Sequence, residues 1–236
     1  MSLRLKFNLW MGMLLAVAVA TAAFVVHGAL HRDARDQVVQ TATLLMAAAE
    51  ATRSYTTVFV KPHLEQRLDI EFLPQTVPAF AATETIIALR KQFSEYSYKE
   101  ATINPTNPRD RTTDWETDIV NTFRNDPAQT QLFGERMQGP TRALYLAKPI
   151  RISDKSCLSC HSSPSLAPAS MIKLYGEANG FGWKHNEVIG AQIVAVPLAA
   201  AERTADRNFT SVMGALVAVA LVALGVGNAL LPRSQA

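Results

Sequence analysis

Cysteine is nearly absent from this chain, with 2 residues among 236, and no catalytic triad, phosphate loop or pair of catalytic carboxylates can be recognised. The two cysteines have no second C-x-x-C or H-x-x-x-H pair nearby, which argues against structural zinc with its four ligands. A net charge of +3, from 23 basic and 20 acidic residues, is too small to indicate nucleic-acid binding. The composition therefore leaves other kinds of function open.

Charge is also missing from two long stretches near the ends of the chain. Residues 9–30 hold no acidic or basic side chain except His27, and residues 209–231 hold none. Each stretch is long enough to cross a hydrocarbon core of about 30 Å as a helix. The first stretch could instead be a cleaved signal peptide, but it exceeds the roughly 7–15 residues of a usual apolar signal core. We therefore predict two transmembrane helices, at residues 9–30 and 209–231.

Basic residues beside the two stretches indicate their orientation. Arg4 and Lys6 precede the first stretch, and Arg233 follows the second. Because cytoplasmic segments are enriched in Lys and Arg, residues 1–8 and 232–236 are predicted to be cytoplasmic. Residues 31–207 are then predicted to form one domain on the opposite side of the membrane.

The two cysteines belong to one short motif, Cys157-Leu158-Ser159-Cys160-His161. Two thiols at this spacing can form thioethers with the vinyl groups of one haem, and the following histidine can bind the iron. A thioredoxin-like redox pair or a small structural disulfide are the alternatives, and both fit an otherwise cysteine-free chain less well. The motif predicts one covalently attached haem c and an oxidising, extracytoplasmic site of assembly, on the same side of the membrane as the domain predicted above.

Periodicity predicts the helices of the domain. Apolar residues recur at helical spacing from Val38 to Ala49, so residues 37–68 are expected to be a stalk helix that Pro62 kinks or ends. A second helix is expected over residues 83–93. A third begins at a capping box formed by Thr113 and Glu116. The pair Asp126-Pro127 predicts the start of a further short helix.

Two segments rich in aliphatic residues, 142–151 and 188–197, predict strands. Residues 199–208 then predict a second stalk helix that leads into the second transmembrane stretch. The fold class is therefore α+β, with one domain bracketed by two transmembrane helices.

Several segments in a fixed order carry a resemblance to a known family. They are the N-P-x-N-P run at 104–108 with Trp115-Glu116, the K-P-I-R run at 148–151, the C-x-x-C-H motif, the G-F-G-W run at 180–183, and a closing strand that begins Gly190-Ala191. Residues 52–198 resemble the PAS-like c-type haem sensor domain of bacterial chemoreceptors and sensor kinases. The resemblance implies a PAS-like antiparallel sheet with flanking helices, thioethers at Cys157 and Cys160, and His161 as the proximal ligand. It also implies anchors in the inner membrane of a bacterium and a haem domain in the periplasm. Sensors of this family continue into a signalling module, whereas only a few residues follow the second transmembrane stretch here. We therefore expect the chain to act through a homodimer or a partner membrane protein.

The sixth iron position is open at this stage. His63 is the first candidate because it lies beside Pro62, where the family packs against its haem. His185, Met137 and Met171 are further candidates, and Arg151 could pair with a haem propionate. Glu116 is expected to lock a loop rather than act as an acid or base.

Three functions fit these features. The first is a membrane-anchored sensor of redox state or of a small gas. The second is a tethered electron-transfer cytochrome. The third is a haem enzyme, such as a peroxidase or nitrite reductase, for which the sequence shows no required acid–base residue.

Overall fold

A computed structural model describes residues 3–230, so the predicted tail 232–236 and residue 231 of the second predicted span lie outside the described residues. The chain forms two compact units. One unit contains the chain ends up to residue 37 and from residue 198 onward, and the other is Val38–Pro197.

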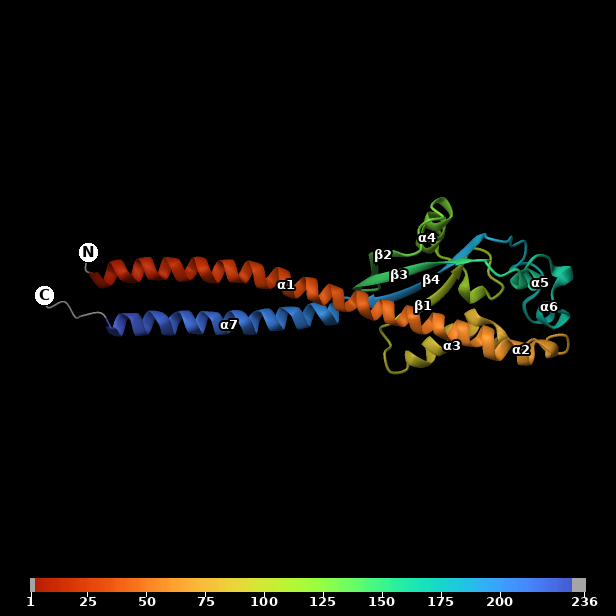
Figure 1. Cartoon of the computed structure of the whole chain (residues 1–236), viewed down its shortest axis with the longest axis horizontal. Coiled ribbons are helices and arrows are strands. Elements are labelled where there is room, and N and C mark those ends of the chain that lie inside the picture. The colour runs from red at the N-terminus through yellow and green to blue at the C-terminus, as the bar shows by residue number, and fades with distance from the viewer. Residues whose placement is uncertain (1–2, 231–236) are drawn as a thin grey trace. The chain divides into compact units, whose positions relative to one another are not determined.

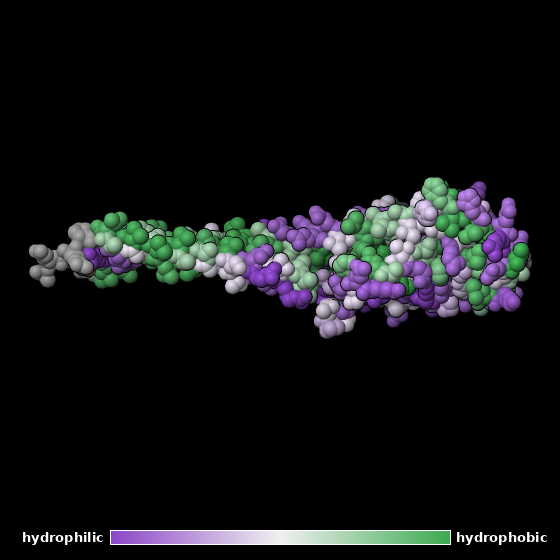
Figure 2. Space-filling view, turned by 90° about the horizontal axis from the view of Figure 1, so that it is seen from below, coloured by the Kyte–Doolittle hydropathy of each residue, from purple (hydrophilic) through white to green (hydrophobic). Residues whose placement is uncertain are grey.

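The first unit consists of two long helices, the beginning of α1 (Leu3–Tyr55) and α7 (Ala199–Leu230). They run side by side (Figure 1), with the ring of His27 edge-on to Phe209 at 5.3 Å and His31 Nε2 3.2 Å from Asp206 Oδ1. Apolar side chains cover most of their visible surface (Figure 2). Both helices are long and apolar enough to span a membrane. The first predicted transmembrane segment and residues 209–230 of the second therefore lie within helices, and the crossing itself stays a prediction.

The second unit is built on a four-stranded sheet, which confirms the predicted α+β class. The strands are β1 (Ser97–Thr102), β2 (Leu132–Gln138), β3 (Thr141–Arg151) and β4 (Val188–Pro197), in the order β1-β4-β3-β2. All three pairings are antiparallel. The strands predicted at 142–151 and 188–197 are confirmed, whereas β1 and β2, which contain charged residues, were not predicted.

Helices cover both faces of this sheet (Figure 1). Alternate residues of a strand point to opposite faces, and Ala147 and Ile193 belong to a buried cluster with Ile119 and Phe123 of α4 (Asp114–Asn125). The predicted capping box of Thr113 and Glu116 starts this helix. The opposite face carries Glu100, Gln192 and Lys148, and α1 lies against it.

Residues 37–55 of α1 form the first part of the predicted stalk helix. The buried residues there follow the predicted spacing: Val38, Ala42, Leu45, Met46 and Ala49. The regular helix ends at Tyr55, and a π-helical turn follows at Thr56–Val60. Next comes α2 (Lys61–Leu64), with Pro62 in its first turn. Proline lacks the N–H of a regular helix, so the irregularity predicted at Pro62 is present just before it.

The helix predicted over residues 83–93 is present as α3, but it begins earlier and ends earlier, at Pro78–Leu89. The helix predicted at Asp126-Pro127 is wrong. The chain after Asp126 forms a turn, in which Asp126 Oδ1 accepts a hydrogen bond from the N–H of Ala128 at 3.1 Å. An aspartate that bonds the backbone two residues on favours a turn over a helix, and β2 begins shortly afterwards. The other short elements are α3 (Pro78–Leu89), α5 (Leu158–His161), α6 (Ala169–Tyr175) and 3₁₀ turns at Glu65–Arg67, Pro74–Thr76, Pro108–Asp110, Lys155–Cys157 and Pro164–Leu166.

Candidate functional site

The C-x-x-C-H motif forms a tight helical turn. Asp154 caps it by accepting a hydrogen bond from the N–H of Ser156 at 2.8 Å, and the turn continues directly into α5. Cys157 and Cys160 are three residues apart on this helical turn, so their side chains lie on one side. Both are half-buried free thiols that line the same cavity. They can therefore react together with one group in that cavity.

The last residue of the motif, His161, has a defined orientation. Its Nδ1 lies 2.7 Å from the carbonyl oxygen of Gly180, so Nδ1 carries the proton and donates it to this acceptor. Burial lowers the pKa of His161, although the hydrogen bond to Gly180 opposes this effect, so the ring is neutral near pH 7. The ring also stacks on Trp183 at 4.0 Å with an interplanar angle of 17°. Nε2 is left with a free lone pair, which is the form of imidazole that binds a metal.

The carbonyl of Gly180, which accepts the hydrogen bond from His161, is held in place by residues of the distant 104–108 segment. Asn104 bonds two adjacent residues of the Gly180 loop: its Nδ2 donates to the carbonyl of Phe181, and its Oδ1 accepts from the N–H of Gly180, both at 3.1 Å. Gly180 has φ = +84°, and a Cβ there would lie 2.1 Å from Oγ1 of Thr106. Glycine is therefore required by both backbone angle and space. Asn104 and Gly180 lie in the segments that carry the resemblance, but their roles at His161 could not be read from the sequence.

A cavity of about 450 Å³ adjoins the motif, which is in the usual range of ligand pockets. It is enclosed by the end of α1, the segment from Leu68 to Phe80, β1, the 105–110 loop, the motif and α6. Its apolar lining includes Leu68, Phe72, Val77, Phe80, Ile150, Ile152, Met171 and Ile189. The cavity is thus mainly apolar, with the two thiols and His161 at one part of its wall.

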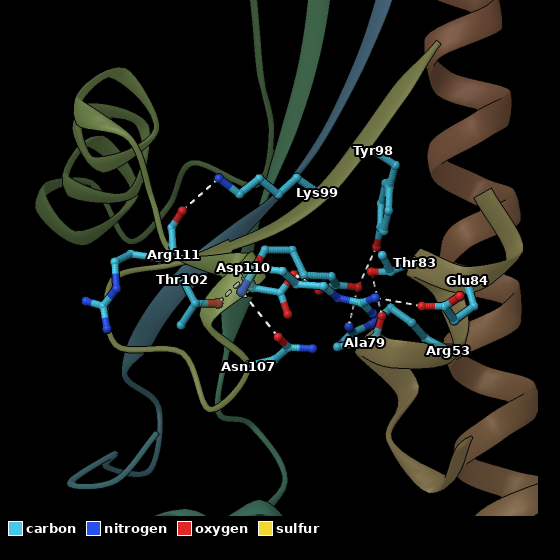
Figure 3. Close-up of polar contacts among 12 residues, drawn as sticks. Arg53, Ala79, Thr83, Glu84, Tyr98, Lys99, Thr102, Asn107, Asp110 and Arg111 are labelled. Carbon is cyan, nitrogen blue, oxygen red and sulfur yellow. Dashed lines mark hydrogen bonds and ion pairs between the residues drawn. The ribbon is translucent and has the colours of Figure 1, made fainter. Parts of the chain in front are cut away.

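A buried polar cluster forms the wall between α1 and β1 (Figure 3). Arg53 Nη1 lies 2.6 Å from Oε1 of Glu100, and the hydroxyl of Tyr98 donates to the same oxygen at 2.5 Å. Arg53 and Glu100 both line the cavity, and Glu100 is only 2% exposed. Burial, with the nearby charge of Glu100, raises the pKa of Tyr98, so its hydroxyl keeps its proton and remains a donor. Nothing in the sequence pattern singled out this cluster.

Only some of the other predicted site residues line the cavity. Arg151 lines the cavity, but its guanidinium donates to the carbonyls of Asn186 and Pro127 at 3.0 and 3.4 Å. His63 is exposed on α2 and is not among the described residues that line the cavity, where Lys61 stands instead. Of the lesser candidates Met171 lines the cavity, whereas Met137 and His185 are exposed elsewhere. The structure thus brings Cys157, Cys160, His161 and Arg151 to one cavity and leaves His63 outside it.

Glu116 has the locking contacts expected of it. Its Oε2 accepts from the N–H of Thr113 and from Nζ of Lys99, both at 2.7 Å. Lys99 also donates to the carbonyl of Arg111 at 2.7 Å, which ties β1 to the start of α4. Among residues 3–230, no group of three or more His, Cys, Asp and Glu side chains is arranged to hold a metal ion by itself.

Comparisons with known proteins give one family. The model of the Tll0287-like family matches residues 31–197. Among solved structures, that of the cyanobacterial heme protein Tll0287 matches with 16% sequence identity and a TM-score of 0.48, covering 69% of this chain and 93% of that one. No curated protein matches the chain.

Proposed function

Because this chain belongs to the Tll0287-like family, with residues 31–197 matching the family model, we propose that it is a membrane-anchored c-type haem protein of the bacterial periplasm. Its proposed task is to register redox state or a small gas at the iron and to pass that state to a partner. The protein after which the family is described is a heme protein. The observation that carries the proposal is the cavity wall where two free thiols and the free Nε2 of His161 lie together.

The residues of the cavity fit a c-type haem. Cys157 and Cys160 would hold it through thioethers, and His161 would bind the iron through Nε2. When bound, the group supplies a one-electron couple and, if its sixth position is open, a site for a small gas. The hydrogen bond to Gly180 and the stacking on Trp183 keep the imidazole ring from turning. The apolar lining excludes water, which strengthens electrostatic interactions inside the cavity.

Replacement of Cys157 or Cys160 by alanine tests covalent attachment. We expect each single variant to hold its haem through at most one thioether, and the double variant Cys157→Ala/Cys160→Ala to lose its haem on denaturation, because no thioether can form. Haem staining of the membrane protein on a denaturing gel measures this, with Ser156→Ala as a control that leaves both thiols. Haem that stays on the denatured double variant would contradict the covalent assignment.

The sixth position separates sensing from electron transfer. Among the described residues that line the cavity, no histidine other than His161 is present, which supports an open or weakly bound sixth site and therefore a sensor of small ligands. The second candidate, a tethered electron-transfer cytochrome, is favoured by Met171, a buried thioether on α6 that lines the same cavity. A reduced spectrum that shifts at once with carbon monoxide supports sensing, and a spectrum that ignores it supports two firm protein ligands.

We also propose that the chain works as a homodimer. Between residues 38 and 60 the only charged residues are Glu50 and Arg53, and both are paired within the domain. The outer face of α1 and of the π-helical turn is therefore uncharged, and its exposed residues are Gln40, Leu44, Ala47, Ala48, Ala51, Tyr55, Val58 and Phe59. Leu44, Ala48, Ala51, Tyr55 and Val58 follow one another at spacings of four and three, as in a coiled-coil seam. Two copies anchored in one membrane would present this face in parallel.

A further inference from the structure

Two carboxylates stand on the wall of the cavity without a role in holding haem. Glu100 comes from β1, and Asp110 comes from the end of the 3₁₀ turn Pro108–Asp110. Both line the cavity, and Figure 3 shows Asp110 close to the polar groups of β1 and of the 105–110 loop. The side chain of Glu100 is 2% exposed and that of Asp110 is 17% exposed. Carboxylates this far from water are uncommon unless they are fully paired.

Glu100 is paired through only one of its oxygens. Arg53 and Tyr98 both donate to Oε1, whereas Oε2 is buried and has no hydrogen-bond partner among the described residues. The charge of Arg53 compensates part of the negative charge. A buried oxygen without a partner is sensitive to any charge that is added to the cavity.

Asp110 is compensated even less. Arg109 Nε lies 3.8 Å from Oδ1 of Asp110, which is beyond a hydrogen bond, and its Nη1 is bound to Glu84 at 2.6 Å. Lys99, the other nearby cation, donates to Glu116 and to a backbone carbonyl. Burial raises the pKa of Asp110 to about 6; the charge of Glu100 adds to this effect, and Arg109 and Lys99 oppose it. Tyr175 of α6 also faces this group, and its own pKa is raised by burial.

We propose that Glu100 and Asp110 form a proton site that takes up one proton when the haem in the cavity is reduced. This inference rests on the proposed haem function. In the step, an external one-electron reductant converts ferric to ferrous iron, and a proton from solvent adds to one carboxylate oxygen of the pair. No other bond forms or breaks. Since the two carboxylates interact, the proton belongs to the pair rather than to either residue.

Reduction of the haem raises the proton affinity of a nearby carboxylate for an electrostatic reason. The added electron makes the cavity more negative by one charge, in surroundings where the dielectric constant is low. A nearby carboxylate becomes harder to ionise, so its affinity for a proton rises. Reduction is therefore easier at low pH, and the midpoint potential falls as pH rises. The fall begins near the pKa of the pair in the oxidised protein and ends at its higher pKa in the reduced protein.

Potentiometric titration of the full-length, haem-loaded protein in detergent, between pH 5 and 8, tests the proposal. For one proton per electron we expect the potential of the unaltered protein to change by up to about 59 mV for each tenfold change in proton concentration. Asp110→Asn should lose most of this slope and so should Glu100→Gln. Asp118→Asn, which removes the same charge from the exposed face of α4 outside the cavity, should keep it.

A second readout shows whether a carboxyl group of this pair takes the proton. The reduced-minus-oxidised infrared spectrum should show a new protonated carboxyl band, which should be missing in Asp110→Asn or Glu100→Gln. A loaded protein whose potential does not change with pH would overturn this inference and leave the haem function intact. A slope that survives in both variants would place the proton elsewhere and overturn it as well. A chain that attaches no haem would overturn the proposed function and this inference together.

Discussion

At the scale of single residues, the chemistry of the site was predictable where it is local. Cys157, Cys160 and His161 lie within five residues, so their spacing alone places them on one helical turn. Asn104, Gly180 and Glu100 could not be assigned in the same way. They reach the site only because β1 pairs with β4 and the 104–108 and 180–183 segments meet, and these contacts span about 76 to 94 residues of sequence.

Gly180 offers a sharp test of how His161 is held. Gly180→Ala should destabilise the domain by about 2–4 kcal/mol, because the new Cβ meets Thr106 and the backbone is at φ = +84°. It should also lower the haem content, since the acceptor of the Nδ1 proton is displaced. Thermal unfolding and the absorbance of the attached haem measure the two effects.

Gly182 is the matched control, because it has φ = +79° but nothing within 4 Å of its Cβ position. Gly182→Ala should cost only about 1 kcal/mol, from the backbone angle alone. Equal losses in the two variants would show that contact with Thr106 does not matter.

At the scale of elements, ion pairs tie α1 to the sheet at two places of different burial. Arg53 reaches Glu100, which is buried, whereas Glu50 meets Lys148 with 40% and 31% of the two side chains exposed. A buried partner left alone carries a large desolvation penalty, while an exposed pair is screened by water. The two ion pairs have similar lengths, so we expect their contributions to stability to differ mainly because of burial.

Arg53→Met should cost about 3 kcal/mol of stability, since it leaves Glu100 buried without its cation. Lys148→Met should cost less than about 1 kcal/mol. Chemical denaturation of the two variants compares them. If Lys148→Met lowered the free energy of unfolding as much as Arg53→Met, burial would not determine how much each ion pair contributes to stability.

The elements also show what the sequence pattern can and cannot specify. The apolar spacing from Val38 to Ala49 predicted a helix and its buried side correctly. The short strand β1 reads Ser-Tyr-Lys-Glu-Ala-Thr, with no aliphatic alternation, so only its pairing with β4 makes it a strand. The helix predicted at Asp126-Pro127 failed because the aspartate bonds a turn instead.

At the scale of the whole molecule, the two long apolar helices predict integral membrane attachment. The chain should remain in the membrane fraction after an alkaline carbonate wash and leave it only with detergent. Release by the wash alone would contradict both predicted spans.

If the uncharged face of α1 joins two copies, the protein extracted in detergent should be a homodimer. Leu44 is 70% exposed at the middle of this face. Leu44→Glu should shift the particle from two copies to one in size-exclusion chromatography with light scattering, because a charge at the seam would be desolvated. Ile70→Glu is the control, since Ile70 is 86% exposed away from this face and should leave two copies. Two copies in both variants would exclude this face as the interface.

The π-helical turn at Thr56–Val60 is the place where α1 can lose one residue with the least change to the surfaces on either side. In this turn the N–H of Lys61 bonds the carbonyl of Thr56, five residues back, so the turn holds one residue more than a regular helix needs. Deleting a residue elsewhere in α1 would rotate everything beyond it by about 100°. Deleting one between Thr57 and Phe59 would instead restore a regular helix, with both flanking surfaces still facing as they do now. Natural length variants of this helix are therefore expected to differ here, within two turns of Arg53.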